Sequence, residues 1–268
     1  MKWYYILLII LLLSIIVSVT INIINNKKEN YNIDKQQIPK NIFQTIRNKN
    51  NINYDIKENI EYLRRTNPTY NYFLYDDNDC IDFIKNNYDK EILDVYLTIN
   101  PKYGPAKADL FRYLLMYKYG GIYLDIKSSC DVPFSQIIND NDRYILTHWS
   151  ERGGHRSSEL LNNFYGEFQQ WHIICVPNHP FLKKVIDNVV QNIKNYDINK
   201  YGVGKKMVLN VTGPIAYTKS ITPLLDENNH TLYKSHKKIN LIYKKFDHIE
   251  YFGKDHYSYC NEPLIKNE

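Results

Sequence analysis

The stretch KYGPAKADLFRYLLMYKYGGIYLDIK, residues 102–127, decides the fold of this chain. Pro105 stands where the first turn of a helix tolerates proline, and residues 106–119 carry apolar side chains at helical spacing. Two glycines then end the helix, and residues 122–126 are aliphatic or aromatic except for Asp125, as in a buried strand. Ligands of open α/β sheets bind beyond the carboxyl ends of the strands, so we expect Asp125 to face a ligand.

The segments before this stretch alternate between strand and helix patterns. Residues 38–46 and 70–75 predict strands, Asn53 is expected to cap a helix that runs to about residue 65, and residues 89–99 predict another helix. This order is typical of βαβ units, in which the strands run parallel.

An acidic cluster, Asp76, Asp77 and Asp79, follows the second predicted strand. Its alternating carboxylates resemble part of a calcium loop, but the glycine and the terminal glutamate of an EF-hand loop are missing. We therefore favour a helix cap over a calcium site.

Two further strands are predicted after residue 127, at 144–149 and 170–176. The polar, glycine-bearing residues 150–156 between them are either a lid over an acceptor or an ordinary surface loop. Asn178 is expected to cap the helix that follows the second of these strands.

Length and composition indicate one sizeable core. The chain has 268 residues, of which 44% are hydrophobic, and a formal net charge of +5 that is spread along the sequence. This modest charge predicts a surface of mixed sign, so we expect no nucleic-acid partner.

The N-terminus is the clearest compositional signal. Residues 3–24 form an apolar run with no charge before Lys27, and about twenty apolar residues suffice to span a bilayer. A cleaved signal peptide is the alternative, but no A-x-A cleavage pattern follows. We expect a transmembrane signal-anchor over residues 1–25, a stem over 26–37 and one globular domain over 38–268. The protein would then be a single-pass type II membrane protein with this domain on the lumenal side of the Golgi or endoplasmic reticulum, or in a host membrane if it is viral.

The four cysteines, Cys80, Cys130, Cys175 and Cys260, show no C-x-x-C spacing. This spacing argues against a zinc ribbon or a thioredoxin-type centre. The sequence leaves two alternatives open, namely up to two disulfides or buried free thiols.

Asp109 and Arg112 lie three residues apart in the predicted helix and share a face opposite to its main apolar stripe. They form either a surface ion pair or a carboxylate and a guanidinium aimed at a ligand near Asp125. Spacing alone does not decide between the two.

Several segments resemble glycosyltransferase family 32, the DXD-type enzymes related to the yeast initiating α-mannosyltransferase. These segments are IPKNIFQTIR at 38–47, NPTYNYFLYDD at 67–77, ADLFRYLLMYKYGGIYLDIK at 108–127, NHPFLKKVI at 178–186 and VTGPIAYTKSI at 211–221. The resemblance implies a GT-A-type α/β fold with a mixed sheet and flanking helices. It also implies retaining transfer of a hexose or N-acetylhexosamine from a UDP- or GDP-linked sugar to a glycan, lipid or protein acceptor.

The resemblance assigns roles to particular residues. Asp109 and Arg112 match the family's sugar-contacting pair, and Asp125 matches the first carboxylate of the DXD motif. Asp109, Arg112 and Asp125 are the candidate catalytic residues. The further candidate substrate contacts are Gln44, Thr45, Tyr123, Lys127, Gly213 and Pro214.

One departure from the family's pattern concerns the second DXD carboxylate, whose place is taken by Lys127. A DXD pair serves a divalent cation, Mn²⁺ or Mg²⁺, that bridges protein oxygens and the donor diphosphate. In one interpretation the cation stays, held by Asp125 together with Asp255 or His256. In the other, the Lys127 ammonium takes over part of the neutralisation, because a protonated lysine cannot ligate a metal. The sequence leaves both open and slightly favours the first.

Lys127 also keeps a second functional class open. A catalytically degenerate protein of the same fold would bind a nucleotide sugar or a glycan without turnover. Donor hydrolysis distinguishes this binding protein from an active transferase.

Overall fold

The computed structural model describes residues 2–149, 160, 166–246 and 257–266, and within the first helix it describes only part of the side chains. The chain divides into two compact units, Met1–Gln36 and Gln37–Glu268, which are described separately below.

The first unit is a single helix, α1 (Lys2–Asp34). Its described side chains between residues 7 and 21 are exposed and are aliphatic apart from Ser14, Ser18 and Thr20. The helix also includes most of the segment predicted as a stem. Searched over the described residues alone, the structure contains no helix that is both long and apolar enough to cross a membrane.

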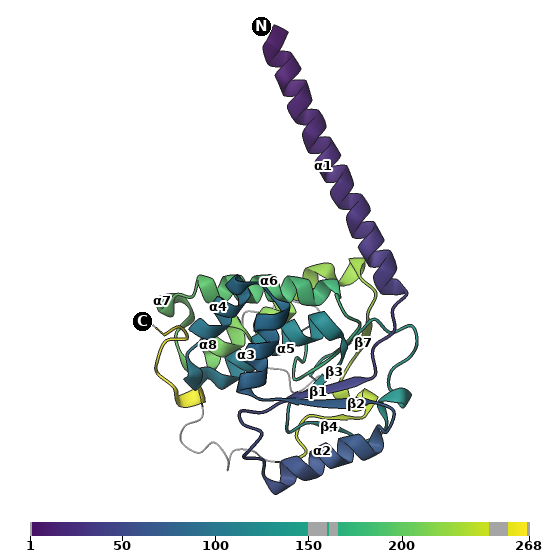
Figure 1. The fold of residues 1–268 in the computed structure, drawn as a ribbon, viewed down its shortest axis with the longest axis vertical. Coiled ribbons are helices and arrows are strands. Elements are labelled where there is room, and N and C mark those ends of the chain that lie inside the picture. Colours follow the sequence, from purple (N-terminus) through teal and green to yellow (C-terminus); the bar gives the residue numbers. More distant parts are fainter. Residues whose placement is uncertain (1, 150–159, 161–165, 247–256, 267–268) are drawn as a thin grey trace. The chain divides into compact units, whose positions relative to one another are not determined.

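The second unit is built on a six-stranded mixed sheet (Figure 1). Its strand order is β2-β1-β3-β6-β5-β7, and every pairing with β6 is antiparallel whereas the other pairings are parallel. One reversed strand therefore interrupts an otherwise parallel sheet, which confirms the predicted mixed sheet. The strands are β1 (Asn41–Thr45), β2 (Asn71–Tyr75), β3 (Gly121–Leu124), β5 (Tyr144–Thr147), β6 (His172–Cys175) and β7 (Thr231–Tyr233). A second, two-stranded sheet pairs β4 (Ser129–Cys130) with β8 (Leu241–Ile242).

Helices cover both faces of the large sheet. Figure 1 shows α2 and the β4 strand on the side opposite to the group formed by α3, α4, α5 and α6. The helices are α2 (Tyr54–Thr66), α3 (Asp77–Asn87), α4 (Lys90–Thr98), α5 (Gly104–Tyr119), α6 (Pro180–Lys194), α7 (Ile198–Tyr201), α8 (Gly204–Val211) and α9 (Pro214–Ile221). The predicted helices and strands before residue 127 are thus present, with boundaries that differ by a few residues.

Helix α5 is buried around its whole circumference along its middle turns. Residues 109–116 are all buried, because α5 packs against α6 as well as against the sheet. Of the two alternatives left by the sequence for Asp109 and Arg112, a surface ion pair is therefore wrong. Both side chains lie inside the protein.

The two glycines after α5 let the chain turn directly into β3. Gly120 and Gly121 have φ angles of +59° and +96°, a region that favours glycine. A Cβ atom on Gly120 would lie 2.6 Å from the backbone nitrogen of Pro177, and one on Gly121 would lie 2.7 Å from the carbonyl oxygen of Asn41. The same residues that end the helix thus allow β3 to lie between β1 and β6.

Two of the predicted helix caps are present and one was misplaced. The Asn53 side chain accepts from the backbone N–H of Ile56, and Asp76 accepts from residues 78 and 79, as expected for caps. Before α6 the cap is His179, whose ring nitrogen accepts from the Phe181 N–H. The predicted cap, Asn178, has a left-handed backbone with φ +59° and precedes the capping position.

All four cysteines are free thiols. Cys80, Cys130 and Cys175 are buried, and burial raises the pKa of each thiol. Of the two alternatives left by the sequence, the free-thiol one holds.

Candidate active site

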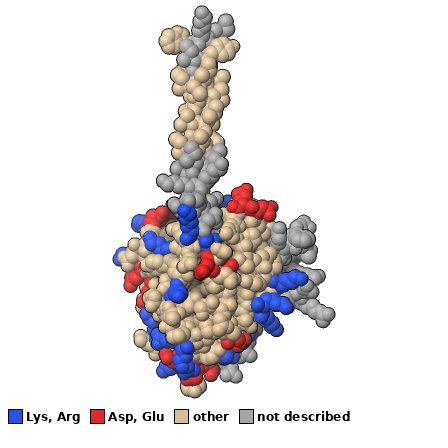
Figure 2. Space-filling model, turned by 90° about the vertical axis from the view of Figure 1, so that its right-hand side faces the viewer, with Lys and Arg blue, Asp and Glu red and all other residues tan. Residues whose placement is uncertain are grey.

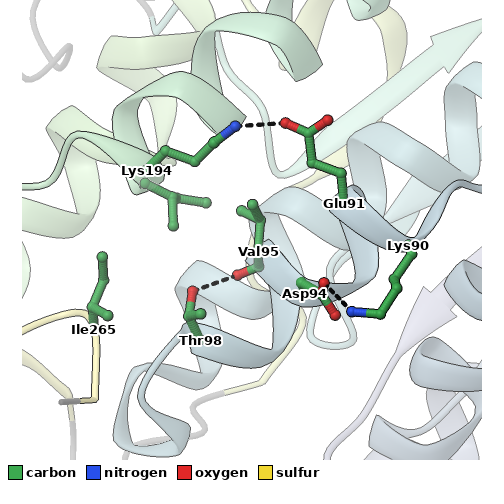
Figure 3. Close-up of a pocket in the computed structure, with 8 residues that line it drawn as sticks. Lys90, Glu91, Asp94, Val95, Thr98, Lys194 and Ile265 are labelled. Atoms are coloured by element: carbon green, nitrogen blue, oxygen red, sulfur yellow. Dashed lines mark hydrogen bonds and ion pairs between the residues drawn. The ribbon is translucent and has the colours of Figure 1, made fainter. Parts of the chain in front are cut away.

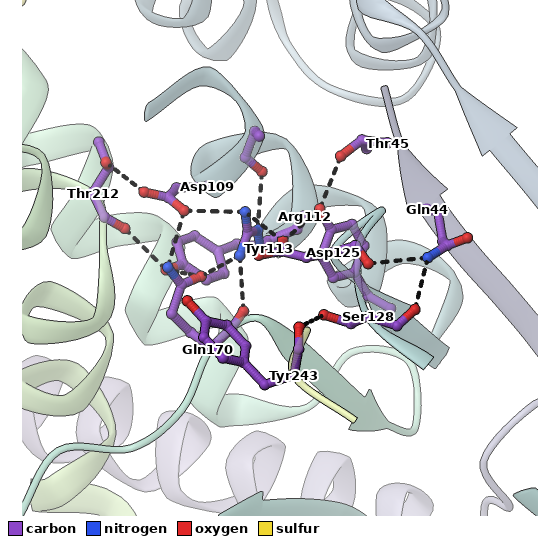
Figure 4. A network of polar contacts seen from close by, with 12 residues as sticks. Gln44, Thr45, Asp109, Arg112, Tyr113, Asp125, Ser128, Gln170, Thr212 and Tyr243 are labelled. Atoms are coloured by element: carbon purple, nitrogen blue, oxygen red, sulfur yellow. Dashed lines mark hydrogen bonds and ion pairs between the residues drawn. The ribbon is translucent and has the colours of Figure 1, made fainter. Parts of the chain in front are cut away.

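A buried ion pair on α5 is the centre of the polar network in Figure 4. Arg112 Nη2 lies 3.3 Å from Asp109 Oδ1, and the two side chains are only 5% and 4% exposed. The same nitrogen lies 3.2 Å from Asp125 Oδ1 at the end of β3. One guanidinium therefore joins a carboxylate of the helix to a carboxylate of the strand.

Asp109 has a protein partner for each carboxylate oxygen. Gln170 Nε2 donates to Oδ1 at 3.0 Å, and Thr212 Oγ1 donates to Oδ2 at 2.9 Å. Burial raises the pKa of Asp109, while Arg112 and these two hydrogen bonds act in the opposite direction. The network thus holds the carboxylate in one orientation.

Arg112 is held equally firmly. Its Nη1 donates to the backbone oxygen of Gln170 at 2.9 Å and to the side-chain oxygen at 2.7 Å. The guanidinium carbon lies 4.9 Å from the centroid of the Tyr123 ring. Burial disfavours the charged form, but Asp125, Tyr123 and Asp109 outweigh it and raise the pKa of Arg112. The guanidinium is therefore a permanent positive charge.

Asp125 is the accessible member of this network. Its side chain is 25% exposed, whereas Asp109 and Arg112 are almost completely buried. The Asp125 N–H donates to the carbonyl of Trp171 at 2.8 Å, which continues the pairing of β3 with β6. The carboxylate lies just beyond the carboxyl end of β3, where the sequence predicted it.

Gln44 and Thr45 lie at the end of β1 and contact the protein itself. The buried Gln44 amide donates to the Asp125 carbonyl at 3.0 Å, and its oxygen accepts from the Tyr72 hydroxyl at 2.7 Å. Thr45 Oγ1 lies 2.9 Å from the Tyr123 hydroxyl. Gln44 therefore fixes the turn that carries Asp125, and Thr45 is the more accessible of the two.

Lys127 lies two residues beyond Asp125 and is half-buried. Its Nζ is 5.1 Å from the centroid of the Tyr243 ring, a cation–π arrangement. Ser128 Oγ donates to the Tyr243 carbonyl at 2.7 Å, so the segment around Tyr243 is tied to the turn after β3 (Figure 4).

Gly213 and Pro214 begin α9, but the residue before them is the one that reaches the network. Thr212 bonds Asp109 through its hydroxyl and accepts the Tyr113 hydroxyl at its carbonyl at 2.9 Å. Gly213 packs tightly on α8, where a Cβ atom would lie 3.0 Å from the Leu209 Cα.

Sequence reasoning missed Gln170, Thr212 and Tyr243 as members of this network. Thr212 belongs to the V-T-G-P segment that carries part of the family resemblance, so the sequence could have indicated its hydroxyl as a candidate contact. Gln170 begins the strand predicted at 170–176, and Tyr243 stands in a segment for which no element was predicted. Only the reversed strand and the small sheet bring the two residues to the network.

Two predicted metal ligands, Asp255 and His256, lie outside the described residues. Among the residues that the structure describes, no group of three or more His, Cys, Asp or Glu side chains could hold a metal ion. At the end of β3 these residues supply Asp125, with Arg112 beside it and Lys127 two positions on. This donor set does not by itself fit a divalent cation, which prefers several oxygen ligands.

A surface pocket elsewhere in the second unit contains none of these residues. It lies between α4, α6 and the C-terminal Ile265, and the ion pair between Lys194 and Glu91 crosses its rim (Figure 3). The face in Figure 2 shows Lys, Arg, Asp and Glu interspersed over the second unit, which agrees with the mixed surface expected from composition.

Comparison with known proteins relates this network to a family. The family described as "Glycosyltransferase sugar-binding region containing DXD motif" matches residues 53–145, which include Asp109, Arg112 and Asp125. Residues 53–145 of the chain thus resemble this family. Where the D-x-D motif has its second aspartate, this chain has Lys127.

Two curated relatives have names that contain a mannosyl group. A mannosyl phosphorylinositol ceramide synthase of Saccharomyces cerevisiae is 30% identical over 181 residues, which is 67% of this chain and 41% of the relative. An initiation-specific alpha-1,6-mannosyltransferase of Schizosaccharomyces pombe is 26% identical over 208 residues, 70% of this chain and 49% of the relative. The chain thus spans less than half the length of each.

A solved structure shares the fold. The PaToxG glycosyltransferase superposes with a TM-score of 0.53 at 19% sequence identity, over 76% of this chain and 78% of that one. The fold of this chain is therefore a mixed α/β, GT-A-like fold, as the sequence predicted.

Proposed function

We propose that this protein is a glycosyltransferase that moves a hexose or N-acetylhexosamine from a nucleotide sugar to an acceptor with retention of configuration. The observation that carries the proposal is the network of Asp109, Arg112 and Asp125, which is buried except at the Asp125 carboxylate. A charged network of this kind costs free energy to bury, so its position at the end of β3 favours a functional role.

The geometry suggests how these residues act on a donor. Asp125 stands at the accessible edge, where the sugar and the diphosphate meet the protein. Arg112 keeps its charge at all physiological pH values and stabilises the negative charge that develops on the departing nucleoside diphosphate. Asp109 and Gln170 hold the guanidinium in place, so no reorganisation is needed when the bond breaks. The acceptor hydroxyl then approaches on the face that the leaving group vacates, as retention requires.

The relatives' names favour a particular choice of substrates. Because one relative is named as a mannosyltransferase and the other as a mannosyl phosphorylinositol ceramide synthase, we propose a mannosyl donor and a glycan or glycolipid acceptor as the first to test. Transfer of the same sugar to a protein acceptor is the alternative to test next.

Release of nucleoside diphosphate from a panel of UDP- and GDP-sugars tests the proposal. We expect release from one donor, strongest with an acceptor sugar or glycolipid present. A protein that binds one of these donors but releases no nucleoside diphosphate under any condition would instead be the catalytically degenerate binding protein.

We also propose that residues 3–24 anchor the protein in a membrane, with residues 38–268 on the lumenal side of the secretory pathway. The largely apolar run in the sequence, in which no charged residue stands between Lys2 and Lys27, supports this proposal. Extraction of cell membranes at alkaline pH tests it: an anchored protein stays in the pellet, and its release into the supernatant would contradict the anchor.

A further inference from the structure

The sequence contains two triplets of the form Asn-x-Thr without proline at the middle position, which is the pattern of an N-glycosylation acceptor. They begin at Asn210 and Asn229 and end at Thr212 and Thr231. A glycan is bulky and hydrated, so a folded domain can carry one only where the asparagine side chain reaches the solvent. The structure therefore distinguishes between the two triplets.

Asn229 meets this condition. It is exposed and lies in the turn between the 3₁₀ helix η4 (Thr222–Glu227) and the strand β7. The turn is fixed through other atoms, because His179 Nε2 donates to the Asn229 carbonyl at 3.3 Å and Thr231 Oγ1 donates to Asp142 Oδ1. Among the residues that the structure describes, none is hydrogen-bonded to the Asn229 side-chain amide. A modified amide thus leaves the contacts of the turn intact.

Asn210 is the less suitable acceptor. It is half-buried in the last turn of α8, and its Nδ2 donates to the Lys206 carbonyl at 3.1 Å. Thr212, the third residue of its triplet, is completely buried and donates to Asp109. This triplet is therefore part of the packed network at the candidate active site, whereas the triplet at Asn229 is not.

The position of Asn229 in the fold keeps a glycan away from the candidate active site. The strands β3, β5 and β7 run in the same direction, since β3 and β5 both pair antiparallel with β6 and β5 pairs parallel with β7. Asp125 follows the C-terminal end of β3, whereas Asn229 precedes the N-terminal end of β7. The two residues therefore lie at opposite ends of the strands, and a glycan on Asn229 leaves the donor site open.

A glycan at this position would also cover an open edge of the sheet. The strand β7 is the last in the order β2-β1-β3-β6-β5-β7, and its outer side pairs with no other described strand. An unpaired edge is a place where a second chain can add a strand. A bulky group two residues before β7 hinders such pairing.

We propose that Asn229 is an N-glycosylation site of this protein. In the reaction, the Asn229 side-chain nitrogen forms a bond to the anomeric carbon of an oligosaccharide that is carried on a lipid diphosphate. The bond from this carbon to the lipid diphosphate breaks, the nitrogen loses one proton, and the lipid diphosphate leaves. The reaction takes place in the lumen of the secretory pathway, so the inference rests on the lumenal placement proposed above for residues 38–268.

Expression of the full-length protein in cultured eukaryotic cells, with protease treatment of intact microsomes, tests the inference. The domain is expected to resist protease outside the vesicles, and an enzyme that removes N-linked glycans should lower the mass of the protein by that of one glycan. Asn229→Gln should lack this mass difference, and Asn210→Gln, the matched control, should keep it. Mass spectrometry of the wild-type peptide that contains Asn229 locates the glycan even if a variant fails to fold.

The outcomes separate the inference from the placement on which it rests. A protease-resistant domain whose Asn229 carries no glycan would overturn the inference and leave the lumenal placement standing. A domain that is digested in intact vesicles would overturn the lumenal placement and the inference with it. Release of nucleoside diphosphate tests the glycosyltransferase proposal separately from both.

Discussion

Asp109 and Arg112 are costly residues to place in the interior, and the surroundings show how the cost is met. Taking two charges out of water is repaid only when the pair is close and the remaining donors and acceptors are bonded. Here Gln170 serves both partners, and Thr212 completes the carboxylate. An apolar pair of similar size would fill the same space, so the charges point to a ligand rather than to stability.

Replacement of Asp109 by asparagine tests this residue with little change in shape. The amide keeps an acceptor for Thr212 but removes the charge that faces Arg112. We expect a loss of about 2 kcal/mol in stability and a fall of about a hundredfold or more in kcat/KM for the donor. Urea unfolding and release of nucleoside diphosphate measure the two effects.

The matched control is Asp82→Asn at an exposed position of α3, which should change neither quantity. If Asp109→Asn lost stability but kept kcat/KM within about twofold of the wild type, the buried pair would be structural and the assigned role of Asp109 wrong.

Glu167 offers a prediction about pH. Its side chain is buried, Trp149 Nε1–H donates to its Oε1 at 2.9 Å, and its Oε2 has no hydrogen-bond partner among the described residues. Burial raises the pKa of Glu167 to about 7 from an ordinary value of 4.5. The folded protein therefore holds this proton more tightly than the unfolded chain does.

The sign of the pH effect follows. The contribution of Glu167 to the free energy of unfolding is fully present below about pH 4.5 and is lost as the pH rises to about 7. Relative to a side chain that does not titrate, this loss is about 2 kcal/mol. Urea unfolding of the wild type and of Glu167→Gln at pH 5 and pH 8 measures it. The wild type should lose more stability than the variant between the two values, and equal losses would show that Glu167 is not perturbed.

At the scale of elements, the join between α5 and β3 sets the geometry of the site. The helix carries Asp109 and Arg112, and Asp125 follows the strand. The backbone conformation at Gly120 and Gly121 therefore sets the distance between the helical pair and Asp125. A side chain at Gly120 would require both a left-handed backbone and displacement of Pro177.

We expect Gly120→Ala to lower the free energy of unfolding by about 2 kcal/mol or more. Gly104→Ala, at the start of the same helix, meets nothing within 4 Å and should be neutral or stabilising by up to about 1 kcal/mol. Urea unfolding compares the two. Equal stabilities would contradict the account of this join.

The order of elements up to Asp125 was predictable because local signals agree there. Each of these signals involves only residues that are close in sequence: the helical spacing, the caps Asn53 and Asp76, and the paired glycines. Burial of Asp109 was not predictable in this way, because it depends on α6 and on the segment at Gln170, which are distant in sequence. The cap at His179 was missed for a different reason: asparagine also favours the left-handed conformation that Asn178 adopts.

At the scale of the whole molecule, the reversed strand β6 brings the later half of the chain to the site. The segment just before β6 contains Gln170, whose side chain accepts from Arg112 of the ion pair, and Trp171, whose ring packs against the ring of Tyr243. The family match ends at residue 145, before these residues begin. The part of the site that holds Asp109 and Arg112 in place thus lies beyond the matched region.

The second unit has its own core, and we expect it to fold without the first. A chain of residues 37–268 should keep its affinity for GDP or UDP within about twofold of the full-length protein and unfold in one cooperative transition. Calorimetric titration and thermal unfolding measure these properties. A truncated chain that fails to fold would show that residues 1–36 are part of the folded domain.

The most direct test of the account is the rate at which the protein releases nucleoside diphosphate from its preferred donor when Asp125 is changed. Asp125→Asn removes the accessible carboxylate of the network, and Asp226→Asn makes the same change at an exposed residue. The account predicts a fall in turnover of about a hundredfold or more for Asp125→Asn and none for Asp226→Asn, with both variants folded. Turnover by Asp125→Asn within about twofold of the wild type would contradict it.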